Sequence, residues 1–340
     1  MKRVLVTGGA GFIGSNFVRY LLGRHDYEVV NFDKLTYAGN RDNLKGLEHE
    51  KRHRFVRGDI CDPAEVEAAI AGCDAVVNFA AETHVDRSLL DAGAFIQTDV
   101  YGAFVLLEAA RHHGVKRFLH ISTDEVYGPR FPDAPAKETD AFAPVNPYAA
   151  SKAGGELQCE AFFRSFGLPV VISRSRNNIG PWQHPEKAVP LFVTNALDDQ
   201  PLPVYGEGLQ VRDRLYVDDN CEALDLILHQ GVAGEAYNVG ADNERPNIEV
   251  AQAILDRLGK PRSLIRFVED RTQHDARYSL DMSKLRALGW SPRHDFESAL
   301  EKTVAWYRDN RWWWEKIKSG EYAAYYRQQY GDRLARSGPA

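Results

Sequence analysis

Short apolar runs rich in β-branched residues alternate with helix-like stretches through the first half of the chain. Six runs have the length and composition of buried strands, at 3–7, 28–33, 53–59, 74–80, 117–123 and 168–174. Helical periodicity fills the intervals, at 12–22, 63–71, 95–113 and 147–166. This alternation predicts an α/β fold in which a doubly wound parallel sheet carries helices on both faces.

The regular alternation is lost after residue 174. Segments punctuated by proline and glycine follow, and helical periodicity returns at 217–229 and 248–258. We therefore expect two domains, a sheet domain over 1–174 and a smaller C-terminal α/β substrate-binding domain over 175–330, with some chain returning to the first domain. The aromatic stretch 311–330 carries charges of both signs, so we expect it to pack onto the protein, and 331–340 to form a flexible tail.

Bulk composition narrows the function classes. A net charge of -6 argues against a nucleic-acid partner, and no apolar run approaches the roughly 20 residues of a membrane span. The chain passes directly from Met1 into a strand pattern, which predicts no cleavable signal. Its four cysteines lack paired spacing, which predicts a reducing, cytoplasmic location and no zinc site. His112 and His113 are adjacent on a predicted helix end, so we expect solvated residues rather than metal ligands.

A glycine-rich turn follows the first strand, in the sequence VTGGAGFIGS. Gly8, Gly11 and Gly14 permit a tight turn and close approach of the backbone to a pyrophosphate at the helix N-terminus. Asp33 ends the second strand, where a carboxylate binds ribose hydroxyls and repels a 2′-phosphate. The pattern predicts a Rossmann-type domain that binds NAD in preference to NADP. Asp59 is expected near the adenine, at the end of the third strand.

Two further motifs carry reactive groups. Tyr148 and Lys152 lie four positions apart on a predicted helix, so they share a face, and an ammonium beside a phenol is expected to lower the tyrosine pKa. Asp124 and Glu125 stand side by side where an apolar strand ends. A solvated turn is one interpretation of this pair. The other is a pair of acids whose mutual repulsion keeps one protonated and one ionised.

The segments TGGAGFIG, STDEVYG and YAASK together resemble the extended short-chain dehydrogenase/reductase family, whose members rework nucleotide sugars on a bound NAD. Within it, AAETHVDRS, NNIGPWQHPEKAVPL and YSLDMSKLRALGW resemble the dTDP-glucose 4,6-dehydratases, and the similarity runs from Val4 to about Tyr330. The resemblance implies oxidation of dTDP-glucose at C4, loss of water across C5 and C6, and hydride return to C6, in deoxysugar biosynthesis.

Three alternatives remain open: the same dehydration of UDP-glucose, a 4-epimerase of nucleotide sugars, and a non-catalytic NAD sensor. The Asp-Glu pair speaks against the epimerase, and intact Thr123, Tyr148 and Lys152 speak against the sensor.

The resemblance also implies roles for individual residues. It assigns Tyr148, with Lys152, to the hydroxyl proton at C4, Thr123 to the 4-oxygen, Asp124 to the acid and Glu125 to the base. The implied cofactor-binding residues are Gly8, Gly11, Phe12, Ile13, Gly14, Asp33, Lys34, Leu35, Thr36, Asp59, Ile60, Phe79, Ala80, Ala81, Thr83, Thr98, Tyr148, Lys152 and Asn178. The implied substrate-binding residues are His84, Thr123, Asp124, Asn177, Lys187, Ala188, Val189, Pro190, Leu191, Phe192, Pro203, Val204, Tyr205, Arg212, Asn247, Asp270, Arg271 and His274. A homodimer is expected through a four-helix bundle of the helices at 95–113 and 147–166.

At some positions the residue differs from the type that is usual in this family. These are Asp99, Arg176, Ile179, Arg214, Thr272 and Gln273. They are expected on the cofactor or nucleotide side of the pocket, and they bear on the choice of base and sugar more than on the reaction.

Overall fold

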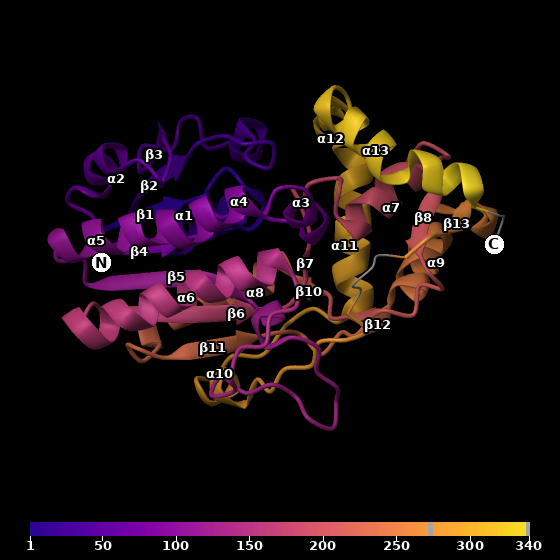
Figure 1. Cartoon of the computed structure of the whole chain (residues 1–340). Helices are drawn as coiled ribbons and strands as arrows, with labels where there is room; N and C mark the ends of the chain where they lie inside the picture. Colours follow the sequence, from indigo (N-terminus) through magenta and orange to yellow (C-terminus); the bar gives the residue numbers. More distant parts are fainter. Residues whose placement is uncertain (271–274, 338–340) are drawn as a thin grey trace.

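A parallel sheet forms the centre of the computed structural model, which describes residues 1–270 and 275–337 (Figure 1). Within these residues the sheet has seven strands in the order β11-β6-β5-β4-β1-β2-β3, and every neighbouring pair is parallel. The strands are β1 (Arg3–Thr7), β2 (Glu28–Asp33), β3 (His53–Arg57), β4 (Ala75–Asn78), β5 (Arg117–Thr123), β6 (Val170–Ser175) and β11 (Ala236–Val239). The order reverses between β1 and β4, which is the switch point of a doubly wound Rossmann-type fold.

Helices cover both faces of this sheet. On one face lie α1 (Phe12–Arg24) and α8 (Val217–Gln230), whose apolar side chains share a core with alternate residues of β1 and β4. The other face carries α2 (Pro63–Ile70), α5 (Ala103–His112) and α6 (Pro147–Phe166). Crossover connections place helices on each face, so the inner strands are largely buried on both sides, whereas the edge strand β3 is only partly buried. The fold class expected from the sequence is confirmed.

The helix expected at 95–113 is interrupted, contrary to the sequence prediction. It follows α3 (Val85–Leu90) and consists of α4 (Ala92–Phe95), a π-helical turn η2 (Ile96–Gly102) and then α5. Asp99 lies in this turn and is buried, with its carboxylate accepting hydrogen bonds from Ser151 Oγ and the Glu82 amide. Such turns widen a helix locally and often occur at functional sites.

A second lobe packs beside the carboxyl ends of the strands (Figure 1). Its core is formed by α7 (Ala188–Leu197), α9 (Asn247–Leu258), α11 (Phe296–Asp309), α12 (Arg311–Ile317) and α13 (Glu321–Arg336). Shorter elements occur in both parts of the molecule. They are the strands β7 (Asn178–Ile179), β8 (Leu202–Tyr205), β9 (Val211–Arg212), β10 (Leu215–Tyr216), β12 (Arg245–Pro246) and β13 (Ile265–Val268), the helix α10 (Ser283–Ala287), and the 3₁₀ turns η1 (Arg41–Leu44), η3 (Asp124–Tyr127) and η4 (Arg262–Leu264).

The aromatic stretch near the C-terminus packs onto the protein, as expected. Trp313 and Trp314 are fully buried, and their indole N–H groups donate to Asn43 Oδ1 and the Tyr307 carbonyl. The helix α13 continues to Arg336, so the first part of the segment expected as a tail is helical. Among the described residues, no helix has the length and apolar character needed to cross a membrane.

Candidate functional site

Two adjoining cavities open at the carboxyl ends of the sheet strands. The first, of about 220 Å³, is lined by the glycine turn and by residues that follow β2, β3 and β4. The second, of about 290 Å³, is lined by the end of β5 and by residues of the second lobe. Tyr148 lines both cavities, so its side chain marks the border between them.

The glycine turn requires its glycines. Gly8 has a φ of +67°, and a Cβ on it would lie 2.6 Å from the backbone nitrogen of Ala80. A Cβ on Gly14 would lie 2.3 Å from the Gly8 carbonyl oxygen. Gly11 caps α1 without a side-chain hydrogen bond. The first backbone N–H groups of the helix, which have no intrahelical acceptor, therefore meet the first cavity without a side chain in the way.

Asp33 occupies the end of β2 as the sequence predicts. Its two carboxylate oxygens accept the backbone N–H groups of Ala10 and Leu35 at 2.9 and 2.8 Å. Burial raises the pKa of Asp33, and the two backbone hydrogen bonds oppose that rise. The carboxylate is thus held in a fixed position at the wall of the first cavity.

Nearly all residues implied for the cofactor line this cavity. They include Gly8, Gly11, Phe12, Ile13, Gly14, Asp33, Lys34, Thr36, Asp59, Ile60, Phe79, Ala80, Ala81, Thr83, Thr98, Tyr148 and Lys152. Leu35 contributes through its backbone N–H to Asp33. Asn178 lines the second cavity instead, where its Nδ2 donates to the Arg176 carbonyl.

The pKa expected for Tyr148 is wrong. Burial, with Glu125, Asp99 and Asp124 adding negative charge, raises this pKa well above its usual value. The Lys152 ammonium, expected to lower it, donates to the Ile121 carbonyl at 2.6 Å. The charge of Lys152 also acts on Asp99, a carboxylate at one of the departing positions. The helical i, i+4 spacing placed the two side chains on one face, but burial and, after it, the neighbouring carboxylates raise the pKa of Tyr148.

The Asp124–Glu125 pair lies at the wall of the second cavity and is not a solvated turn. Asp124 is buried, and its Oδ2 has no hydrogen-bond partner among the described residues. Burial raises the pKa of Asp124 to about 7, and the neighbouring Glu125 adds to the rise. Glu125 is half-buried and accepts from Asn146 Nδ2 at 3.2 Å. Its pKa is also raised by burial, with Arg212 opposing. Asp124 is therefore the carboxyl that holds a proton near neutral pH.

Thr123 connects the pair to Tyr148. Its hydroxyl donates to Asp124 Oδ1 at 3.2 Å and accepts the Glu125 amide N–H at 3.3 Å. A hydrogen bond between Thr123 and Tyr148 favours the ionised phenol. The five residues that carry the reactive motifs are therefore contiguous in space, at the border of the two cavities.

Three guanidinium groups of the described residues line the second cavity. Arg212 stacks on the Tyr278 ring, with 4.8 Å from its Cζ to the centroid, and donates to the Asp275 carbonyl at 2.8 Å. Arg214 is buried and donates to Asn247 Oδ1 at 2.7 Å, and burial lowers its pKa to about 9. Arg176 is buried in ion pairs with Asp213 and Glu244. Two of these arginines occupy positions that depart from the family's habit, and both are close enough to act on charged groups in the cavity.

The residues implied for the substrate divide into two groups. His84, Thr123, Asp124, Asn177, Lys187, Ala188, Val189, Arg212 and Asn247 line the second cavity. Pro190, Leu191, Phe192, Pro203, Val204, Tyr205 and Asp270 do not, and several of them pack in the core of the second lobe. Of the departures, Ile179 is buried and lines the second cavity, and Asp99 is buried behind the first. Arg271, Thr272, Gln273 and His274 lie outside the described residues.

Sequence reasoning missed several residues that line the cavities. Gln183, His184 and Glu186 border the first cavity from the loop before α7. Asn146 and Tyr278 contact Glu125 and Arg212 in the second. The loop lies within the segment NNIGPWQHPEKAVPL and Tyr278 begins the segment YSLDMSKLRALGW, so both motifs were usable signals, whereas Asn146 stands outside the quoted motifs.

Comparisons with known proteins agree with this geometry. The family model described as GDP-mannose 4,6 dehydratase matches residues 5–303. A dTDP-glucose 4,6-dehydratase of Streptomyces niveus is 52% identical over 94% of this chain and 97% of its own. The low-salt glycan biosynthesis protein Agl12 of Haloferax volcanii is 51% identical over 89% of this chain and 98% of its own.

Among solved structures, DesIV, a dTDP-glucose 4,6-dehydratase from Streptomyces venezuelae, was determined with NAD and dTDP bound. It matches with a TM-score of 0.91 and 49% identity, over 93% of this chain and 100% of that one. The chain therefore belongs to the GDP-mannose 4,6 dehydratase family and, within it, groups with the dTDP-glucose 4,6-dehydratases, which are hydro-lyases.

Proposed function

We propose that this chain dehydrates dTDP-glucose to dTDP-4-keto-6-deoxyglucose, a reaction of deoxysugar biosynthesis. The observation that carries the proposal is the buried Asp124 beside Glu125 at the end of β5. Elimination of water needs a protonated acid and an ionised base close together, and like charges at short range keep the pKa values of two carboxyls apart. Relatives named for this reaction cover nearly the whole chain.

NAD is the cofactor that the first cavity fits. The glycine turn brings the N-terminus of α1 to the cavity, where the helix favours a pyrophosphate. The Asp33 carboxylate suits ribose hydroxyls and disfavours a 2′-phosphate. When bound, NAD supplies the acceptor for the C4 hydride, the hydride returned to C6, and a positive charge that favours a tyrosinate nearby.

Tyr148 and Thr123 act on the C4 hydroxyl in this proposal. The Tyr148 oxygen accepts the hydroxyl proton, and the Thr123 hydroxyl hydrogen-bonds the same sugar oxygen. Lys152 holds its place through the Ile121 carbonyl, so it contributes a fixed positive charge that acts on Asp99. This arrangement makes Lys152 a positioning and electrostatic group.

Glu125 and Asp124 carry out the elimination. The ketone at C4 acidifies the C5 proton, which Glu125 removes as the C5–C6 double bond forms. Asp124 gives its proton to the departing C6 hydroxyl, which leaves as water. Glu125 afterwards returns a proton to C5. Tyr148 releases the proton that it took from the C4 hydroxyl and Asp124 takes one up, so the complete cycle consumes no net proton.

The arginines of the second cavity serve the nucleoside diphosphate. Arg212 and Arg214 present guanidinium groups to the cavity, and a guanidinium binds phosphate oxygens through paired N–H groups. Lys187, Asn177 and Asn247 border the same space. These side chains recognise the pyrophosphate more directly than the base. We therefore infer the preference for thymine over uracil from the relatives named as dTDP-glucose 4,6-dehydratases.

We also propose a homodimer formed through α5 and α6. Apolar side chains that are exposed in the single chain gather on these helices and on η2, namely Ile96, Tyr101, Phe104, Leu157 and Phe166. A second copy of the chain would cover them in a four-helix bundle. Replacement of Leu157 by Lys should shift the protein to a monomer in sedimentation velocity, and an unchanged dimer would contradict this interface.

The division into an NAD-binding part over 1–174 and a mainly nucleotide-sugar-binding part over 175–330 remains our proposal. It is supported by the separate apolar core of the second lobe, while β11 and α8 are chain that returns to the sheet.

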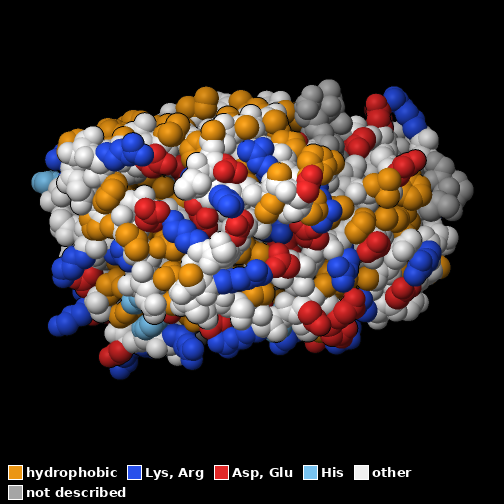
Figure 2. Space-filling model, turned by 90° about the horizontal axis from the view of Figure 1, so that it is seen from below, with side chains coloured by type: hydrophobic (Ala, Val, Ile, Leu, Met, Phe, Trp, Pro, Cys, Tyr) orange, Lys and Arg blue, Asp and Glu red, His pale blue; other side chains and the backbone are white. Residues whose placement is uncertain are grey.

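We also propose a cytoplasmic location, supported by four cysteines that are all free in the described part of the chain. Charges of both signs alternate over the face seen in Figure 2, with no continuous basic area there.

Mass spectrometry of the purified protein incubated separately with dTDP-glucose and UDP-glucose tests the function. A product lighter by one water from dTDP-glucose supports the proposal. An isobaric product would indicate a 4-epimerase, and preferential conversion of UDP-glucose would indicate the alternative base. If neither sugar is converted although NAD is bound, the remaining alternative is a non-catalytic NAD sensor.

A further inference from the structure

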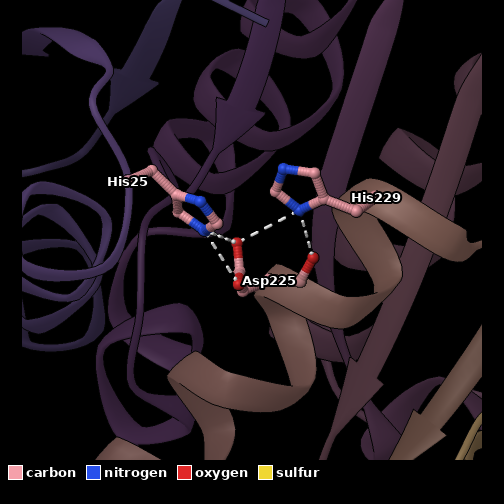
Figure 3. Close-up of side chains that lie close together, drawn as sticks. All are labelled: His25, Asp225 and His229. Carbon is pink, nitrogen blue, oxygen red and sulfur yellow. Dashed lines mark hydrogen bonds and ion pairs between the residues drawn. The ribbon is translucent and has the colours of Figure 1, made fainter.

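Two imidazoles and a carboxylate meet on the face of the sheet that carries α1 and α8 (Figure 3). His25 follows the last residue of α1, at the opposite end of the fold from the glycine turn. Asp225 and His229 lie four positions apart on α8, so they share one face of that helix. The helices α1 and α8 pack on each other through a common apolar core, which fixes the relative position of the three side chains.

The donor atoms have the separations of a metal site. His25 Nε2 lies 2.9 and 3.0 Å from the two carboxylate oxygens of Asp225. His229 Nδ1 lies 3.2 Å from Asp225 Oδ1, and one atom from each residue falls within 4.8 Å of the others. Tetrahedral zinc with ligands at roughly 2.0–2.2 Å sets neighbouring donors about 3.3 Å apart. The donors are therefore close enough to bind one ion once His229 Nδ1 gives up its 2.8 Å hydrogen bond to the backbone carbonyl of Asp225.

A second layer of contacts orients the imidazoles. Tyr27 Oη lies 2.8 Å from His229 Nε2, so the outer nitrogen of that ring has a partner while the inner one faces Asp225. Stacking holds the ring planes, with the His25 centroid 4.6 Å from that of Tyr27 and 5.0 Å from that of His229. A partner on the outer ring nitrogen is typical of metal-binding histidines.

Solvent reaches the cluster. The side chains of His25, Asp225 and His229 are 25%, 16% and 28% exposed. They border a surface cavity to which Glu222 also contributes. An ion can enter from this cavity, and a water molecule can complete its coordination.

We propose that His25, Asp225 and His229 bind a divalent transition metal ion of the zinc type, with a fourth position open to water. Two imidazoles and one carboxylate suit such ions better than Mg²⁺ or Ca²⁺, which prefer oxygen ligands alone. The ion ties the end of α1 to α8 and takes no part in the dehydration, because the cavities lie at the other end of the strands. Binding displaces the protons that the imidazoles share with Asp225.

A second cluster in the chain offers a matched control. His112 and His113 both contact Glu67, at 3.2 and 2.6 Å, although the sequence argument held that adjacent helical residues do not face one partner. His113 lies at the C-cap of α5, off the helical position, which allows both rings to reach the carboxylate. His112 is 76% exposed, so this cluster lacks the packing that orients His25 and His229.

Calorimetric titration of chelator-treated protein with Zn²⁺, together with visible absorption of the Co²⁺-loaded protein, tests the proposal. The native protein should bind about one Zn²⁺ per chain, and His25→Gln and His229→Gln should each weaken binding by more than about 100-fold. Tyr27→Phe should weaken it by roughly 10-fold, as expected for an outer partner. His113→Gln should bind like the native protein, and circular dichroism without metal verifies that each variant is folded.

Equal Zn²⁺ affinity in the native protein and in folded His25→Gln and His229→Gln would overturn the site, as would the absence of saturable binding. If one of the two glutamine variants does not fold, the other variant and the Co²⁺ spectrum decide whether the metal site exists. A spectrum of imidazole-ligated Co²⁺ in the native protein that survives in His113→Gln supports the site, and loss of that spectrum in His113→Gln overturns it.

Discussion

The two cavities are built in different ways. The cofactor cavity takes most of its walls from short stretches that follow β1, β2, β3 and β4 in turn, at the same edge of one sheet, and the loop before α7 closes it. The sugar cavity takes its walls from the end of β5 and from segments spread between residues 175 and 278. The first is lined by the carboxylates of Asp33, Asp59, Glu82 and Glu186, and two backbone hydrogen bonds fix that of Asp33 at the end of β2. Among the described residues, the second brings the carboxyls of Asp124, Glu125 and Asp275 into one space with the guanidinium groups of Arg176, Arg212 and Arg214.

Because of this difference, substitutions in the first cavity should change the affinity for the dinucleotide, and substitutions in the second should change the rate of the reaction. Changes on the cofactor side act mainly on which dinucleotide binds, because the groups there make fixed hydrogen bonds to the chain. Changes on the sugar side act on proton transfer, because its charges set each other's pKa. Tyr148 lines both cavities, and a change there is expected to have the largest effect on turnover.

Tyr148→Phe should lower turnover by about 10³- to 10⁴-fold, the upper part of the range for a positioned base. The phenol oxygen is lost, but the ring that packs edge-on against Phe95 remains. Calorimetry should find nearly native affinity for NAD and for the nucleotide sugar. Turnover close to native would contradict the role of Tyr148 at the border.

Asp124→Asn should slow elimination by roughly 10²- to 10³-fold, because an amide keeps the shape but cannot deliver a proton. Oxidation at C4 does not need that proton, so the 4-keto-glucose nucleotide should accumulate and be detectable by rapid quench and mass spectrometry. Glu125→Gln should stall the same step and also abolish deuterium exchange at C5. If both variants dehydrate at the native rate, the pair has no catalytic role.

Arg212→Ala should weaken binding of the nucleotide sugar by roughly 10- to 100-fold, as expected for charge-assisted hydrogen bonds. Affinity for NAD should not change, because Arg212 borders only the sugar cavity. Calorimetric titration with dTDP and with NAD measures both. A matched loss of affinity for both ligands would mean that the two cavities are not separable.

The pH dependence of turnover should report on Asp124. Its pKa is raised to about 7, so the acid is protonated below pH 7 and turnover should fall about tenfold per unit above it. The folded state holds this proton more tightly than the unfolded state, so the free energy of unfolding should fall as pH rises from about 4 to 7. Denaturant titrations should show a weaker fall in Asp124→Asn. An identical pH response of stability in that variant would contradict the raised pKa.

Asp33→Asn should have the smallest effect, a narrowing of the preference for NAD over NADP by roughly tenfold. The amide keeps one acceptor oxygen but removes the charge that repels a 2′-phosphate. Competitive binding of the two dinucleotides measures the ratio, and affinity for dTDP serves as the control. Equal binding of NAD and NADP by the native protein would show that Asp33 does not select the cofactor.

The sequence determined the parts of this protein that depend on local order along the chain. Alternating strands and helices imposed a parallel sheet, and helix α6 runs over the residues that its periodicity indicates. The glycine turn and Asp33 sit where predicted, because the carboxyl ends of consecutive parallel strands meet at one edge. β11 was missed because its four residues stand in the part of the chain where the alternation of strands and helices is lost.

Tertiary structure decided what depends on contacts between distant residues. Burial, with the charges of Glu125, Asp99 and Asp124, raises the pKa of Tyr148 although Lys152 is near in the sequence. The buried Asp99 accompanies a π-helical turn where the periodicity predicted an uninterrupted helix. His25 and Asp225 meet although 200 positions separate them, so no spacing rule indicates their cluster. Periodicity encodes which face of an element is buried, but the electrostatics of a side chain depend on every charge packed around it, and only the folded chain places those charges.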